Sequence, residues 1–108
     1  MRGRRRRVYA KTTPTDLRKG FNGLYGIIAN GFGADPLAGD TFVFMNRRRT
    51  LVKTMRWDGT GFRICIKVLA KGRFADLFGD ASGDRIVLSR KKHGLLLSGT
   101  DAKGLFMP

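Results

Sequence analysis

The sequence has few of the residues that support covalent cross-links, metal centres or acid–base catalysis. Its one cysteine, Cys65, can form neither an internal disulfide nor a cysteine-rich zinc site. It has no glutamate, so each of its 8 acidic residues is an aspartate, and the residue most used in capping boxes is missing. The single histidine, His93, has no second histidine or cysteine near it in the sequence. These absences disfavour an enzyme, and we expect neither a metal ion nor a cofactor.

A long apolar segment is also missing. No stretch approaches the roughly 20 apolar residues that cross a membrane as a helix, and the arginine-rich start is unlike a secretory signal. We therefore predict a cytoplasmic protein, associated with the nucleoid if its charge binds DNA. With 108 residues and 42% apolar content, the chain suffices for one small domain with a two-layer core and is too short for two independent cores.

Positive charge is what the chain has in excess. It carries 22 Lys and Arg against 8 Asp, a formal net charge of +14 at pH 7. Such charge repels itself unless a polyanion or a partner neutralises it, so it indicates a phosphate-bearing ligand. Nucleic acid is the first candidate. Residues 1–7 hold five arginines and are predicted to form a basic, disordered arm. Residues 8–108 are predicted to form a single α+β domain.

Residues 14–29 carry the pattern of a main helix. Thr13 can cap it, Pro14 is favoured at a first helical position, and Asp16 suits the positive end of the helix dipole. Apolar residues then recur at helical spacing: Leu17, Phe21, Leu24 and Ile28.

Three alternating segments, 41–46, 50–57 and 61–69, predict an antiparallel meander, with a three-arginine tip at 47–49 and a hairpin at 58–60. Pairing Phe44 with Leu51 and Trp57 with Phe62 puts most apolar residues on one face. That face carries Phe42, Phe44, Leu51, Met55, Trp57, Phe62, Ile64, Ile66 and Val68, and the other carries Arg56, Arg63 and Lys67.

The predicted architecture is a small two-layer α+β domain, an antiparallel meander of three to five strands covered by one main N-terminal helix. Short strands are predicted at 8–10 and 85–88, and Ser89 can cap a last helix that ends at Gly99. Lys53 is the one charged residue on the apolar face. We predict it at the sheet margin, with its amine in water, and a functional role is the alternative.

The candidate nucleic-acid-binding residues are cations on the predicted helix, hairpin tip, polar sheet face and the loop after the third strand. We expect their side chains to contact phosphates. They are Arg18, Lys19, Arg47, Arg48, Arg49, Arg56, Arg63, Lys67, Lys71 and Arg73.

No catalytic residue is assigned, because the aspartates near these motifs already have structural uses. Asp16 suits a helix start, Asp58 suits a turn, and Asp35 precedes Pro36. A metal-dependent nuclease needs several carboxylates converging on one or two cations. The sequence gives no pattern that predicts such a convergence.

Several sequence blocks are similar, in order, to those of a known family. They are PTDLRKGFNGL at 14–24, DPLAG at 35–39, FVFMNRRR at 42–49, WDGTGF at 57–62 and KGRF at 71–74, with a closing segment LLLSGTD at 95–101. On these blocks the chain resembles the TnpB accessory protein, also called Orf2-like, of bacterial insertion-sequence family sixty-six. The arginine-packed start and residues 75–84 depart from the family's usual sequence.

The resemblance implies a helper protein encoded beside a separate, larger transposase and a second small accessory protein. It implies a requirement in transposition without cutting or joining of DNA, and it supplies no active-site residues. We therefore expect DNA and the transposase as partners. The DNA is either the element ends or nonspecific duplex. The oligomeric state stays open. Two alternatives are a docking module that meets the transposase through the glycine-lined helix or the corner at 57–59, and an RNA-binding protein.

Overall fold

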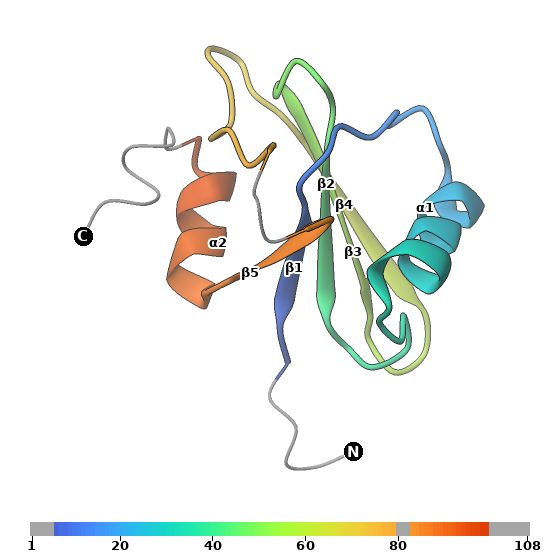
Figure 1. The fold of residues 1–108 in the computed structure, drawn as a ribbon. Helices are drawn as coiled ribbons and strands as arrows, with labels where there is room; N and C mark the ends of the chain where they lie inside the picture. The colour runs from blue at the N-terminus through green and yellow to red at the C-terminus, as the bar shows by residue number, and fades with distance from the viewer. Residues whose placement is uncertain (1–5, 80–82, 100–108) are drawn as a thin grey trace.

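A five-stranded mixed sheet is the centre of the computed structural model, which describes residues 6–79 and 83–99 (Figure 1). The strands lie in the order β4-β3-β2-β1-β5, with β1 parallel to β2 and the other neighbours antiparallel. Their bounds are β1 Val8–Lys11, β2 Thr41–Met45, β3 Leu51–Trp57, β4 Phe62–Val68 and β5 Arg85–Leu88. Two α-helices, α1 Phe21–Ile27 and α2 Arg90–Leu97, complete the α+β fold that the sequence predicts.

The predicted meander is confirmed, since β2, β3 and β4 begin and end within one residue of the predicted bounds. Trp57 pairs with Phe62 as predicted, but Phe44 pairs with Lys53 rather than with Leu51. The pairing is shifted by two residues because the turn between β2 and β3 is longer than a two-residue hairpin loop. A shift of two leaves every side chain on its predicted face, because side chains alternate with period two along a strand.

The first core lies between α1 and the sheet, on the predicted apolar face. Phe42, Phe44 and Met55 are at most 1% exposed there, and they pack against Leu24 and Ile28. The helix covers only the start of the outer strand, where Phe62 packs against Phe21 and Tyr25. Ile64, Ile66 and Val68 of β4 lie on this face as predicted, yet they are 41%, 56% and 62% exposed.

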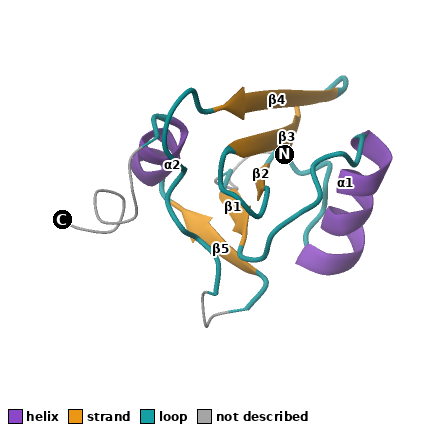
Figure 2. Cartoon of the chain, turned by 90° about the horizontal axis from the view of Figure 1, so that it is seen from above, coloured by secondary structure: helices purple, strands orange, loops and turns teal. Residues whose placement is uncertain are grey.

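A second apolar core lies on the opposite face of the same sheet, which the sequence analysis predicted to carry cations. Val43, Met45 and Val52 point there and pack with Phe74 and with Leu96 of α2. Figure 2, seen along the sheet, shows α1 and α2 on opposite sides of the strands. Ser89 caps α2 as predicted, because its side chain accepts a hydrogen bond from Lys92 N.

The main helix begins later than the sequence predicts. The prediction of a start at Pro14 is wrong, since α1 begins at Phe21 and continues from Ile28 to Phe32 as a π-helix. Residues 14–19 instead run past the end of the sheet, where Thr15 N donates to Met45 O at 2.9 Å.

Lys53 explains why the helical pattern fails here. Its amine donates to Leu17 O at 2.7 Å and to Lys19 O at 3.3 Å, so the prediction of an amine in water is wrong. In a helix these two carbonyls would accept from Phe21 N and Gly23 N. These bonds tie residues 17–19 to the sheet, and this tertiary contact competes with extension of the helix towards Pro14.

Replacing Gly26 by alanine is expected to stabilise the protein by about 1 kcal/mol, because glycine is the poorer helix former. The nearest atom to an added methyl group would be Asn30 Nδ2 at 4.0 Å, so the space is open. Thermal unfolding should show a melting temperature about 4–8 °C higher. The control is Gly33→Ala, which should destabilise because Gly33 has φ +62°. Equal effects of the two substitutions would contradict this account.

Candidate nucleic-acid interface

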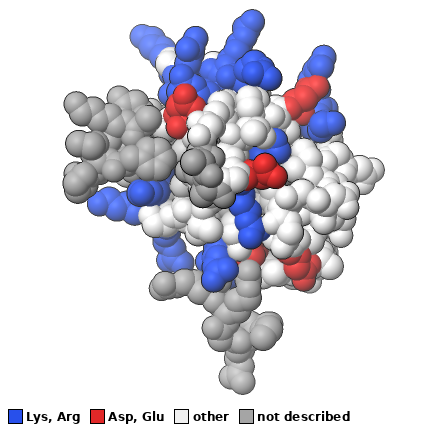
Figure 3. Space-filling view, in the orientation of Figure 1, with Lys and Arg blue, Asp and Glu red and all other residues white. Residues whose placement is uncertain are grey.

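Three loops meet at one end of the sheet and bring most of the predicted site together. The chain at 15–19 bonds to the end of β2, the turn at 46–50 joins β2 to β3, and the loop at 69–74 follows β4. Leu69 N donates to Thr50 O at 3.0 Å, and Phe74 N donates to Arg49 O at 2.7 Å. We call this surface the basic end and define it as Arg18, Lys19, Arg47, Arg48, Arg49, Lys71 and Arg73. Figure 3 shows Lys and Arg side chains gathered at the top of the molecule, over these loops.

Asn46 builds the turn that carries the three-arginine run. Its side-chain oxygen accepts from Thr50 N at 2.9 Å and from Leu51 N at 3.1 Å, and its Nδ2 donates to the Thr50 hydroxyl at 3.1 Å. The Asn46 side chain accepts hydrogen bonds from two backbone amides of the turn. Arg47 and Arg48, both exposed, are thus held at its tip with their side chains in solvent.

Arg49 differs from its two neighbours because it also has a structural role. It is half-buried, has φ +59°, and donates from Nη1 to Phe74 O at 3.0 Å. With the backbone bond from Phe74 N, this ties the loop after β4 to the β2–β3 turn. Arg49 therefore positions Lys71 and Arg73 in addition to contributing charge.

Arg18 forms an ion pair with Asp16, in which the two side chains are 91% and 47% exposed. Its Nε and Nη2 atoms donate to the two carboxylate oxygens at 2.9 and 2.8 Å. The guanidinium bonds, followed by the bond from Arg18 N, hold the pKa of Asp16 well below its usual range. The pair offsets the charge of Arg18, while no other cation of the basic end pairs with a carboxylate in the described part of the chain.

An open groove runs between the first two loops of the basic end. It is lined by residues 14–18 on one side and by Asn46, Arg47, Arg48 and Leu51 on the other. Three arginines thus border a concave surface, an arrangement suited to a phosphate backbone.

The remaining three predicted cations lie on the sheet, outside the three loops of the basic end. Arg56 and Arg63 pair across β3 and β4, on the face away from α1. Lys67 lies on the same face, and its amine donates to Leu97 O at the end of α2. Arg63 Nε lies 2.9 Å from Asp58 Oδ2, so part of its charge is offset.

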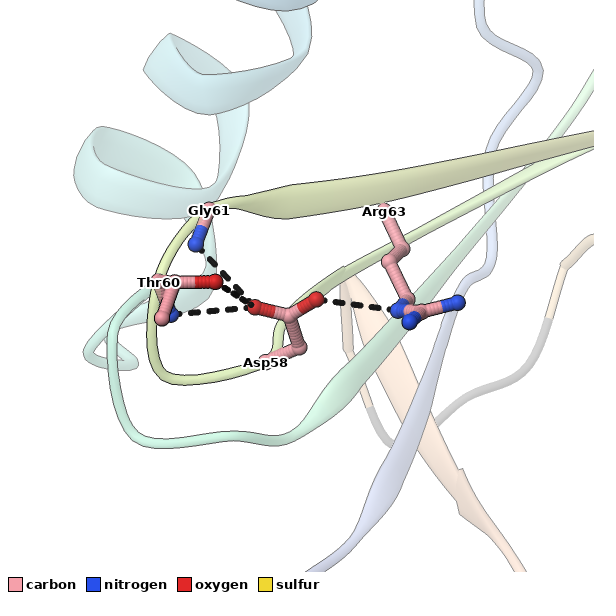
Figure 4. Close-up of polar contacts among 4 residues, drawn as sticks. All are labelled: Asp58, Thr60, Gly61 and Arg63. Carbon is pink, nitrogen blue, oxygen red and sulfur yellow. Dashed lines mark hydrogen bonds and ion pairs between the residues drawn. The ribbon is translucent and has the colours of Figure 1, made fainter.

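Asp58 organises the turn between β3 and β4 (Figure 4). Its Oδ1 atom accepts from Thr60 N at 3.0 Å, from the Thr60 hydroxyl at 3.1 Å and from Gly61 N at 3.0 Å. The bond from Thr60 N, followed by those from Arg63 and Gly61, holds the pKa of the carboxyl group well below its usual range. The predicted turn role of Asp58 is confirmed.

An Asp58→Asn variant is expected to have a lower melting temperature than the native chain at pH 7, because the amide loses the charge that faces Arg63. A carboxyl group with a depressed pKa stabilises the fold above its unfolded pKa of about 4, and this contribution declines as the pH falls below that value. Thermal unfolding followed from pH 7 downwards should therefore show the two curves converging under acid. A difference that stays constant with pH would show that the charge has no part in it.

A recess at the opposite end of the sheet brings together three cations outside the candidate set, of which Arg85 was missed by the sequence analysis and Arg6 and Arg7 were placed in the basic arm. Arg6, Arg7 and Arg85 line a recess that Tyr9 and Trp57 also border. The guanidinium carbon of Arg85 lies 4.5 Å from the centre of the Tyr9 ring. These cations come from two segments far apart in the sequence, and no motif links them. Pairing of β1 with β5 puts Arg85 opposite Lys11, and the Arg85 side chain reaches back to the Tyr9 ring, whose hydroxyl accepts from Arg7 Nη1 at 3.5 Å.

Arg6 and Arg7, which the sequence analysis placed in the disordered arm, are described residues. Arg7 N donates to the buried Asp40 carboxylate at 2.8 Å, and Arg7 O accepts from Thr41 N at 2.9 Å. The rest of the predicted arm, residues 1–5, lies outside the described residues.

Neither a metal centre nor a membrane span is found in the part of the chain that the structure describes. No three His, Cys, Asp or Glu side chains there are grouped so that they could hold a metal ion. Among residues 6–79 and 83–99, no helix has both the length and the apolar character needed to cross a bilayer.

Comparison with known proteins gives a family. The model of the family described as "IS66 Orf2 like protein" matches residues 6–105. The chain belongs to this family. It is similar to the uncharacterized protein y4jC of Sinorhizobium fredii (strain NBRC 101917 / NGR234), with 34% identity over 95 residues, 88% of this chain and 80% of the relative. It is also similar to the uncharacterized protein y4hO of the same strain, with 36% identity over 99 residues, 92% of this chain and 84% of the relative. No solved structure matches.

The match to the IS66 Orf2-like family confirms the resemblance that the sequence blocks indicate. It includes all three loops of the basic end and the recess at the other end. Residues 1–5, with three arginines of the predicted arm, lie before the matched segment.

Proposed function

We propose that this IS66 Orf2-like protein is a nonenzymatic accessory protein of insertion-sequence transposition that binds DNA through its basic end and assists a separate transposase. The observation that carries the proposal is the gathering of seven cations on three loops that meet at one end of the sheet. Family membership supports the connection with an insertion sequence.

The basic end suits contact with a phosphate backbone better than reading of base edges. Its cations lie on loops around an open groove, and no helix of the described chain presents a row of side chains there. Contacts to phosphates position a protein on a duplex without reading its sequence. We therefore expect nucleic-acid binding with little sequence discrimination at this surface.

A docking module for the transposase is a second candidate, and one observation favours it. The recess at the other end of the sheet combines Trp57 with the 49% exposed Leu37, and such residues are common in protein interfaces. Capture of the transposase by this protein, with and without nuclease treatment, separates the two roles. Capture that survives removal of DNA supports docking, and both roles can hold together.

The decisive experiment compares binding of the protein to three probes at low salt. The probes are duplexes of the terminal repeats of the parent element, unrelated duplex DNA, and structured RNA. Binding of each probe is measured by fluorescence anisotropy. We expect both duplexes to bind. The ratio of their dissociation constants should be near one if the protein contacts only phosphates. Absence of duplex binding, or a clear preference for RNA, would overturn the DNA proposal. Cleavage of the duplex in the presence of magnesium would overturn the nonenzymatic part.

A further inference from the structure

The outer edge of β4 is the least covered part of the sheet. Six of the seven residues of β4 are exposed, and among the described residues the strand pairs with β3 alone. The outward amide and carbonyl groups of such a strand can hydrogen-bond to another chain. A long exposed edge of this kind is normally covered, shortened or charged, because it invites pairing with other strands.

One face of this edge is apolar. Ile64, Ile66 and Val68 point to the α1 side and are 41%, 56% and 62% exposed. The apolar surface continues through Phe62 to Phe21 of α1, whose ring centres lie 5.0 Å apart, and Phe21 is itself 40% exposed. An added strand would find apolar contacts at every second position on this side.

The other face of the edge is cationic. Arg63 and Lys67 point to this side, and Arg56 lies directly behind Arg63 on β3. Arg63 also pairs with Asp58, and the Lys67 amine donates to Leu97 O, so both are anchored at this face with donors left for a carboxylate. An added strand would therefore place its alternate side chains beside positive charge. Opposite charges at neighbouring positions across a sheet stabilise the pair, and like charges destabilise it.

This charge argues against a second copy of the same chain as the occupant. Antiparallel pairing of all seven β4 residues with a second β4 would centre on Cys65 and place Arg63 opposite Lys67 twice. Both copies would also carry a net charge of +14. The occupant that fits both faces is a segment of different sequence, apolar on one side and acidic on the other.

We propose that β4 is a docking edge for an extended segment of a partner protein in which apolar residues alternate with aspartate or glutamate. The segment would pair with the free backbone of β4, cover Ile64, Ile66 and Val68, and set its carboxylates beside Arg63 and Lys67. Recognition of this kind takes its affinity from the backbone and its specificity from the alternate side chains. It does not depend on DNA binding, because the basic end is formed by loops and β4 pairs with β3 alone among residues 6–79 and 83–99.

The test uses a fluorescent peptide of about ten residues that alternates valine with glutamate. A second peptide has the same composition with its glutamates grouped at one end, so it has the same charge without the pattern. Binding to the full chain is measured by anisotropy, and hydrogen exchange of the β4 amides is measured with and without the alternating peptide. We expect the alternating peptide to bind at least about tenfold more tightly and to slow exchange in β4.

Two matched variants separate strand pairing from simple charge attraction. Ile66→Lys places a cation in the apolar face of β4, and Val87→Lys places one on β5, where Val87 is 58% exposed on the other edge of the sheet. Simple charge attraction would strengthen acidic-peptide binding in both variants. Pairing on β4 predicts instead a loss of about tenfold in Ile66→Lys and none in Val87→Lys.

Three results would overturn the proposal. The first is equal binding of the two peptides, and the second is undiminished binding to Ile66→Lys. The third is sedimentation of the peptide-free protein as a dimer that Ile66→Lys dissociates, since the occupant would then be a second copy. Protection of the β4 amides in the native chain tests the proposal even where a variant fails to fold.

Discussion

The affinity of the protein for duplex DNA is expected to fall about 10³- to 10⁴-fold when the salt concentration rises from about 50 to 200 mM. The seven cations of the basic end set this expectation. Each phosphate that a cation neutralises releases condensed counterions, so the logarithm of the binding constant falls with the logarithm of salt with a slope of about −0.9 per phosphate. Seven contacts give a slope of about −6, which anisotropy titrations at several salt concentrations measure directly.

A double substitution at the turn tip tests where the DNA binds. Arg47→Gln with Arg48→Gln removes two exposed cations whose side chains have no described partner, so the slope should become shallower by about two. The matched control is Arg90→Gln with Lys91→Gln, which removes two exposed cations from the start of α2. This control variant should keep nearly the full salt dependence of the native chain. Equal losses in both variants would show that DNA binds through net charge alone, without a defined surface.

The sheet could be predicted from the sequence because alternation of side chains and turn residues determines strands locally. The segments of β2, β3 and β4 alternate cleanly, and Asp58 marks the turn between the last two. The pairing of Phe44 could not be fixed in the same way, because two registers that differ by two residues present identical faces. The choice between them depends on the side chain of Asn46, whose hydrogen bonds lengthen the turn.

The candidate site could be predicted only where charge is clustered in the sequence. Arg47 and Arg48 lie at a turn tip because a turn there follows from the strands on both sides. The meander also predicts that Lys71 lies at the same end, because the chain leaves β4 at the end of the sheet that carries the β2–β3 turn. Arg85 could not be assigned to a basic recess, because the sequence does not reveal that β5 pairs with β1.

The start of the main helix was predicted wrongly for a reason that lies far away in the sequence. Residues 14–20 have good local helix signals, but the carbonyls of Leu17 and Lys19 are taken by Lys53, more than thirty residues later. Local signals for a helix are weak compared with tertiary contacts. The sequence indicates this contact only through Lys53 itself, a single charged side chain on an otherwise apolar sheet face, and such a residue also suits the margin of a sheet.

Lys53→Met is therefore expected to lower the free energy of unfolding by about 1–3 kcal/mol. Methionine keeps an apolar stem of similar length at the position between Phe44 and Ile66. What is lost is a charged donor. The part-buried bond to Leu17 O accounts for most of the loss, since a hydrogen bond to a charged group contributes about 1.5–3 kcal/mol, and the long, exposed bond to Lys19 O adds little. Urea denaturation followed by circular dichroism measures the change.

Lys67→Met provides the matched control, because it makes the same chemical change on the next strand. Both substitutions remove one positive charge from a chain of net charge +14, so any relief of charge repulsion is equal in the two variants. Lys67 is exposed, and its amine serves a single carbonyl, Leu97 O, so the expected cost is below about 1 kcal/mol. If Lys53→Met were no less stable than Lys67→Met, the Lys53 amine would not be what holds residues 17–19 outside the helix. Faster hydrogen exchange at 14–20 in Lys53→Met alone would locate the loss where the structure predicts it, because only there does the lysine connect the sheet to the chain before α1.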